Sequence, residues 1–169
     1  MADYRIDHSA HLVDLHAAQI LDVLGPTIQF LTDTSDDAAP CILRGTIPPG
    51  AMAPLHSHPD PETFIALTEG LEGFSTAGRW VRIAVGETFH VPPGAKHAFR
   101  NAGAAPCVAV VVTTARLGRF FREIGRPLGA GPPTADAVEH FLETARRYGH
   151  WNASPEQNAA IGIRLPAAA

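Results

Sequence analysis

The chain has few cysteines and no long apolar run. Cysteine occurs only at Cys41 and Cys107, each inside an apolar run, where a buried and inert thiol is expected. No window approaches the roughly 18 uninterrupted apolar residues that a membrane span requires. The first residues lack the basic and then apolar order of a secretory signal. We therefore expect a cytoplasmic protein with no membrane partner.

An excess of basic charge is also absent. The chain has 13 Lys and Arg against 17 Asp and Glu, a formal net charge of −4. No cluster of basic residues is interleaved with aromatic ones, as a nucleic-acid surface would need. These features exclude nucleic acid as an expected partner and leave a small molecule.

What the chain does have is turn formers and enough apolar residues for one core. It contains 15 Gly and 15 Pro among 169 residues, and 46% of its residues are hydrophobic. This composition favours a single domain with many short elements separated by turns.

The spacing of apolar residues along the sequence changes twice. Residues 1–26 are expected to form a helical arm, because Leu12, Leu15, Ile20 and Leu24 recur at roughly helical spacing. Residues 116–169 return to helical texture, with helices expected at 117–124 and 135–148; His140 and His150 of this region are expected to be solvated. Between them, residues 27–115 are expected to form a β domain. Its strands are expected at 28–31, 41–47, 63–67, 80–85, 88–91, 98–100 and 107–113.

Four polar residues of this β region have the spacing of a metal site. His56 and His58 are separated by one residue, which in an extended chain puts both imidazoles on one face. Glu62 follows after a Pro-Asp-Pro turn, and His97 lies in a second run, after a Pro-Pro-Gly turn. If these strands are neighbours in one sheet, three neutral imidazoles and one carboxylate converge. That donor set suits one divalent transition metal ion, whether Fe, Mn, Ni, Cu or Zn.

Two longer patterns contain these residues. The first is Gly50-x5-His56-x-His58-x3-Glu62. The second is Gly86-x5-Pro92-x-Gly94-x2-His97-x3-Asn101. The first is similar to the first cupin motif, and the second matches the second cupin motif at every position. The segments on either side resemble those of small, single-domain bacterial cupins of the quercetinase-like type.

The resemblance implies an all-β fold, a jelly-roll β-barrel with the metal held inside it. It also implies that His56, His58, Glu62 and His97 are the metal ligands. Glu62 has a second role open to it, because in a cupin site this carboxylate either binds the ion or swings off it to act as a catalytic base. A site that has lost its metal, or uses it only structurally, is the alternative.

The sequence departs from the cupin pattern at one point. The family has six residues between the Glu of its first motif and the closing Gly, whereas Thr63–Glu69 supplies seven. Because side chains alternate along a strand, we expect a bulge near Leu67–Glu69 or a longer turn before Gly70.

Alternation also predicts the neighbours of the ligands. Residues two positions from a ligand share its face of a regular strand, so Met52 should accompany His56, Phe64 should accompany Glu62, and Phe99 should accompany His97. These three residues are expected to line a substrate pocket. Ordinary packing of the barrel core fits them equally well.

Four protein donors leave at least one coordination position open for a substrate. We expect a metal-dependent, dioxygenase-like oxidoreductase that acts on a small oxygenated compound, aromatic or flavonol-like. Two alternatives stay open: a lyase or isomerase that works through an enediolate, and a non-catalytic cupin that binds a small ligand. The terminal arms cover either their own barrel or a second subunit, so a homodimer is also open to the chain.

Overall fold

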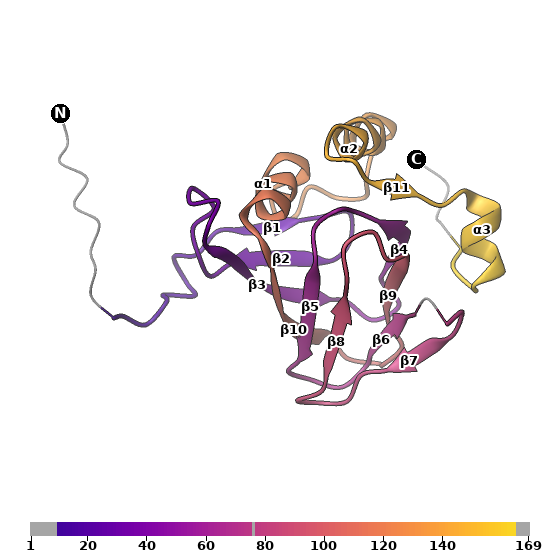
Figure 1. Cartoon of the computed structure of the whole chain (residues 1–169), viewed down its shortest axis with the longest axis horizontal. Helices are drawn as coiled ribbons and strands as arrows, with labels where there is room; N and C mark the ends of the chain where they lie inside the picture. The colour runs from indigo at the N-terminus through magenta and orange to yellow at the C-terminus, as the bar shows by residue number, and fades with distance from the viewer. Residues whose placement is uncertain (1–9, 76, 165–169) are drawn as a thin grey trace.

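The computed structural model of the chain describes residues 10–75 and 77–164, and within them the strands form two antiparallel sheets (Figure 1). The six-stranded sheet has the order β1 (Ile20–Asp22), β2 (Thr27–Phe30), β3 (Pro40–Ile47), β10 (Cys107–Thr114), β5 (Glu62–Ala66) and β8 (Thr88–Val91). The five-stranded sheet has the order β11 (Trp151–Asn152), β4 (Met52–Ser57), β9 (His97–Asn101), β6 (Leu71–Phe74) and β7 (Trp80–Arg82). The helices are α1 (Ala115–Ile124), α2 (Ala135–Arg147) and α3 (Pro155–Ala160). The expectation of a mostly β fold is confirmed, but the described strands make two separate sheets rather than one closed barrel.

Strand β10 shows how the sequence specifies these sheets. Its residues alternate between buried and half-buried from Cys107 to Thr114, so one face packs into the core. It pairs with β3 along its whole length, and on its other side with β5. Every strand predicted from an apolar run overlaps an observed one. The prediction misses β1, β4, β6 and β11.

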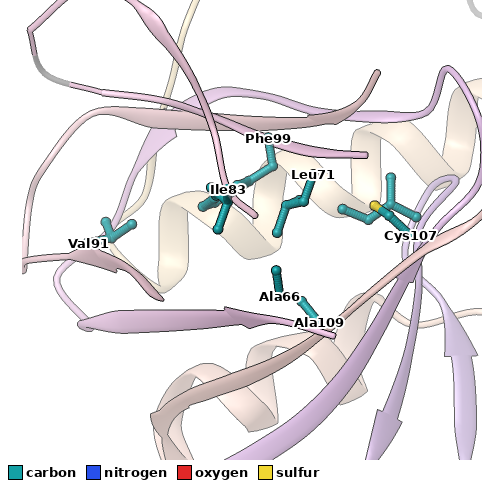
Figure 2. Packing of buried hydrophobic residues seen from close by; sticks show 8 residues of the cluster. Ala66, Leu71, Ile83, Val91, Phe99, Cys107 and Ala109 are labelled. Carbon is teal, nitrogen blue, oxygen red and sulfur yellow. The ribbon is translucent and has the colours of Figure 1, made fainter. Parts of the chain in front are cut away.

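Side chains from both sheets fill the space between them. Figure 2 shows Leu71 and Phe99 of the five-stranded sheet opposite Ala66 and Ala109 of the six-stranded sheet. Large side chains on one layer against small ones on the other give the close packing of a protein interior. Leu71 is fully buried there. The histidines of the site lie next to this core, because the Phe99 ring packs against the His97 ring.

Both thiols are buried, as expected. Cys107 belongs to the core in Figure 2, and Cys41 packs with Leu43 and Phe30 between the six-stranded sheet and α1. Burial raises the pKa of the Cys41 thiol to about 11, so the thiolate is scarce at neutral pH.

The extra residue after Glu62 forms a bulge at Leu67 and Thr68. The backbone N–H groups of both residues donate to the carbonyl of Val108, at 2.8 Å and 3.3 Å. Two residues on one strand opposite one on its partner define a β-bulge. Because the irregularity follows the end of β5, the regular pairing of Glu62 with Val91 is undisturbed.

The prediction of an N-terminal helical arm is wrong for the residues that the structure describes; residues 1–9 of that arm lie outside them. Residues 15–18 form only a turn, next to Asp14, and the chain then enters β1, where Ile20 pairs with Gln29 of β2. Pairing with β2 buries Leu21, which the helical stripe would have left out, while Leu12 stays 96% exposed. Tertiary pairing has overridden the local spacing of leucines.

The two longer helices of the C-terminal region are confirmed. The hydroxyl of Thr114 accepts from Leu117 N at 3.1 Å and caps α1. Buried residues of α1 such as Leu117 and Phe120 pack with Ala145 of α2, so the helices lie side by side beyond one end of the sheets (Figure 1). None of the helices in the described ranges has both the length and the apolar character that crossing a membrane takes. Residues 165–169 of the predicted extension lie outside the described residues.

The close approach of α1 to β3 depends on Gly118. A Cβ at this position would lie 2.6 Å from Cys41 Sγ and 2.7 Å from Thr34 Cγ2. We predict that Gly118→Ala lowers the free energy of unfolding by about 1–3 kcal/mol, because overpacking outweighs the better helix propensity of alanine. Urea denaturation measures the change. The cost should shrink when Cys41→Ala is made first; an equal cost in both backgrounds would refute the steric account.

Candidate metal centre

Three histidines are brought together by the pairing of β4 with β9. His56 of β4 lies directly opposite His97, the first residue of β9. His58 follows the end of β4, and its carbonyl accepts from Gly94 N at 2.8 Å. Gly94 has a φ of 76°, a left-handed conformation that glycine adopts without strain. The Pro-Pro-Gly turn therefore fixes both the start of β9 and the backbone of His58.

A bulge in β4 corrects the predicted neighbours of His56. Ala53 pairs with Phe99 and His56 pairs with His97, so three residue steps on β4 match two on β9. The face of β4 changes across this irregularity. Met52 consequently packs against the cluster of Leu55 and Ala98 on the other face of the sheet, whereas Ala53 packs with the core that contains Phe99. The expectation that Met52 shares the face of His56 is wrong.

The three imidazoles converge on one point. Each of His56, His58 and His97 offers a ring nitrogen, and these atoms all lie within 4.8 Å of one another. The ring centroids of His56 and His97 are 4.2 Å apart, and those of His58 and His97 are 5.0 Å apart. His58 and His97 are buried, and His56 is half-buried. The open side of the cluster is therefore beside His56.

A backbone carbonyl orients each ring. Nδ1 of His56 contacts Pro54 O at 2.6 Å, Nδ1 of His58 contacts Asp60 O at 2.7 Å, and Nδ1 of His97 contacts Ala95 O at 2.8 Å. A carbonyl only accepts hydrogen bonds, so each Nδ1 carries the proton and donates it. This leaves Nε2 as the ligand atom of each ring, as in protein metal sites where the second nitrogen holds the ring in place.

Glu62 approaches the histidines from the opposite sheet. It is the first residue of β5, 4% exposed, and its Oε2 lies 3.3 Å from His58 Nε2 and 3.4 Å from His97 Nε2. Burial alone would raise the pKa of Glu62, but the close approach of the His58 and His97 imidazoles outweighs it and holds the pKa well below its usual range. The carboxylate is therefore ionised at neutral pH.

The centre favours a positive charge beside Glu62. Burial alone would lower the pKa of His58, yet the Glu62 carboxylate outweighs it and raises the pKa. Nε2 of His97 is buried and has no hydrogen-bond partner among the described residues. An unpartnered lone pair, two further imidazole nitrogens and an anionic oxygen make a donor set that fits a divalent transition metal.

The other predicted pocket residues lie on the core side of the centre. The rings of Phe64 and Phe99 are 3.9 Å apart between centroids, and Phe99 lies 5.6 Å from the His97 ring. Phe99 is 2% exposed. The two phenylalanines thus form an apolar wall behind the imidazoles.

The sequence prediction misses a fourth histidine. His150, expected to be solvated, is half-buried, with its ring centroid 5.2 Å from His58 and 4.3 Å from Phe120. Its Nε2 is buried without a hydrogen-bond partner in the described part of the chain. Burial lowers the pKa of His150 to about 4, so its ring is neutral at pH 7. Its position comes from the pairing of β11 with β4, which no local pattern signals.

Comparison with known proteins agrees with this architecture. Residues 43–113 match the family model of the cupin domain. This segment contains His56, His58, Glu62 and His97. Germin-like protein 3-7 of Oryza sativa subsp. japonica is 37% identical over 102 residues, 57% of this chain and 44% of that protein. The chain thus matches less than half the length of this curated relative.

Solved structures share the fold. The polyketide cyclase RemF of Streptomyces resistomycificus superposes with a TM-score of 0.58 at 18% identity, over 80% of this chain and 99% of its own. A sugar phosphate isomerase of the cupin superfamily from Silicibacter pomeroyi superposes with a TM-score of 0.55 at 20% identity, over 62% of this chain and 75% of its own.

The burial of His56 predicts a pH effect on stability. Burial first, and then the charges of His97 and His58, lower the pKa of His56 from 6.5 to about 3. Between these values the unfolded chain binds more protons, so this group makes the free energy of unfolding fall as pH falls from about 6.5 to about 3. Urea denaturation of metal-free protein at pH 7 and pH 5 should show a smaller loss for His56→Asn than for the parent. Equal losses would contradict the assignment.

Proposed function

Because residues 43–113 match the family model of the cupin domain, we propose that this chain is a metal-dependent cupin enzyme acting on a small oxygenated compound. Its ligands are His56, His58 and His97, with Glu62 as fourth ligand or as base. The observation that carries the proposal is the convergence of three imidazole nitrogens whose rings are each fixed by a carbonyl. The reaction that we propose is a dioxygenase-like oxidation.

The donor set limits the ion. Three imidazole nitrogens and a carboxylate suit Fe, Mn, Ni, Cu or Zn better than Mg or Ca, which prefer oxygen donors. A divalent ion held here acts as a Lewis acid and lowers the pKa of a substrate hydroxyl that ligates it. A substrate with adjacent oxygens, such as an enediol, a flavonol or a β-dicarbonyl, offers such a hydroxyl.

The chain's own residues complete the chemistry. The ionised Glu62 carboxylate accepts the proton of the substrate hydroxyl at Oε, while His58 and His97 hold that carboxylate in place. Phe64 and Phe99 pack behind the imidazoles and exclude water on the core side. A flat, oxygenated compound entering beside the half-buried His56 would meet the imidazoles and the Glu62 carboxylate.

The oxidation balances without a separate reductant. In a dioxygenase both atoms of O2 enter the substrate, whose own bonds supply the electrons. The same base without O2 would move a proton between carbons through an enediolate, as a lyase or isomerase does. The ionised state of Glu62 suits both reactions, so oxygen consumption distinguishes them.

Cytoplasmic location, a homodimer and the three-part division at residues 26 and 115 stay predictions.

Metal content is the first test. Protein purified without chelator should contain about one transition-metal ion per chain by elemental analysis, and His97→Ala should lose most of it. His140→Ala is the matched control, because His140 is an exposed residue of α2 whose Nε2 contacts the Glu123 carbonyl at 3.1 Å. Retention of the metal by His97→Ala would overturn the proposed centre.

Glu62→Gln tests the base. If Glu62 accepts the proton, this variant should keep its metal and lose about 10²- to 10⁴-fold in turnover of flavonols or β-dicarbonyls, measured with an oxygen electrode. Glu69→Gln, at the exposed ion pair with Arg82, is the control. Turnover by the parent without oxygen uptake would indicate a lyase or isomerase. Binding without any turnover would indicate a non-catalytic module.

A further inference from the structure

The ring of His58 depends on a single backbone carbonyl, that of Asp60. Nδ1 of His58 contacts this oxygen at 2.7 Å. Asp60 lies in a turn between Pro59 and Pro61 and is 5% exposed. The two flanking prolines restrict the backbone of the turn, so the Asp60 carbonyl moves only if the turn moves as a unit. The position of Asp60 therefore determines the direction of one ligand nitrogen.

The carboxylate of Asp60 accepts hydrogen bonds from residues that lie beyond the segment 43–113 that matches the cupin family. The Thr114 hydroxyl, which caps α1, donates to Asp60 Oδ1 at 2.6 Å. The Arg116 guanidinium donates to Asp60 Oδ2 and to the carbonyl of Tyr148, just after α2. Arg116 also lies over the Tyr148 ring, with 5.3 Å between its Cζ and the ring centroid. One arginine thus ties α1, the end of α2 and the turn of Asp60 together.

Two further contacts reinforce this junction. The Thr113 hydroxyl donates to Pro61 O at 2.7 Å, next to the bond from Thr114 to Asp60. His150, two residues beyond Tyr148, packs its ring against His58. The C-terminal extension therefore contacts the turn and the ligand from two sides.

We propose that Arg116 is a positioning residue of the metal centre, which holds the Asp60 carbonyl on His58 so that the C-terminal helices set the metal affinity. The inference rests on the proposed metal site. It extends that site beyond residues 43–113, the segment that matches the cupin family.

The carboxylate of Asp60 is buried. The side chain of Asp60 is 6% exposed, and a carboxylate with so little water needs a cation or several donors. Without Arg116, the Thr114 hydroxyl is the remaining hydrogen-bond donor to this carboxylate among the described residues, so the turn is expected to open toward water. The Asp60 carbonyl then moves with it. Loss of such an outer hydrogen-bond partner typically costs about 10- to 100-fold in metal affinity.

The chain offers a closely matched control for Arg116. Arg119 lies on the same helix, and its side chain is as exposed as that of Arg116, at 40%. It too donates to one carboxylate, that of Asp37, and to one carbonyl, that of Thr34. Both its partners lie away from the histidines. Arg116→Gln and Arg119→Gln therefore remove the same kinds of bond. The carboxylate is buried in the first case and 80% exposed in the second, and only the first bond bears on the metal centre.

The test is titration of the metal-free chain, residues 1–169, with Co²⁺, monitored by calorimetry and by visible absorption of the bound ion. Arg116→Gln should weaken Co²⁺ binding by about 10- to 100-fold and alter the absorption spectrum, while Arg119→Gln leaves both unchanged. Arg116→Lys, which keeps a cation opposite Asp60, should recover most of the affinity. Equal effects in the two glutamine variants, or none in either, would overturn the positioning role.

Two further results keep the test decisive. If circular dichroism shows that Arg116→Gln is unfolded, Asp60→Asn replaces it, because this variant keeps the shape of the side chain and removes its charge. Unchanged Co²⁺ affinity and spectrum in Asp60→Asn would then overturn the proposal. If the parent itself binds no Co²⁺, the proposed metal site fails, and the role of Arg116 fails with it.

Discussion

The site depends on one repeated interaction, the hydrogen bond from an imidazole Nδ1 to a backbone carbonyl two residues away. It occurs at His56, His58 and His97, and each time it directs Nε2 toward the same point. Because the acceptors are main-chain atoms of strands and tight turns, the ring directions follow from the fold itself. Preorganised ligands of this kind lower the cost of gathering three nitrogens around one ion.

The two-sheet architecture explains why a carboxylate stands beside these rings. The histidines come from the five-stranded sheet and its adjoining turn, whereas Glu62 begins a strand of the six-stranded sheet. The sheets meet through an apolar core, which excludes water and so strengthens the attraction between the carboxylate and any cation at the imidazoles. Packing and electrostatics are thus coupled. Burial beside the core raises the pKa of Glu62, and the neighbouring imidazoles lower it again, so the carboxylate stays ionised.

The sequence predicts the site better than its surroundings. The His-x-His spacing and the Pro-Pro-Gly turn before His97 act within a few residues, so the sequence predicts where each imidazole lies along its own segment. The pairing of β4 with β9 then brings the imidazoles together. Met52 was misplaced because a bulge opposite β9 changes the face of β4, and bulges leave little trace in a pattern of alternation. His150 and the arm around Leu12 depend on strand pairings between distant segments, β11 with β4 and β1 with β2, which periodicity cannot reveal.

X-ray absorption spectroscopy of the metal-loaded protein tests the central claim most directly, because it reports the kind and number of atoms bound to the ion. Outer-shell scattering from three imidazole rings, with oxygen in the remaining positions and no sulfur, is the predicted result. Fewer than three imidazoles, or a sulfur ligand, would contradict the account, since both thiols are buried away from His56, His58 and His97 in the described structure.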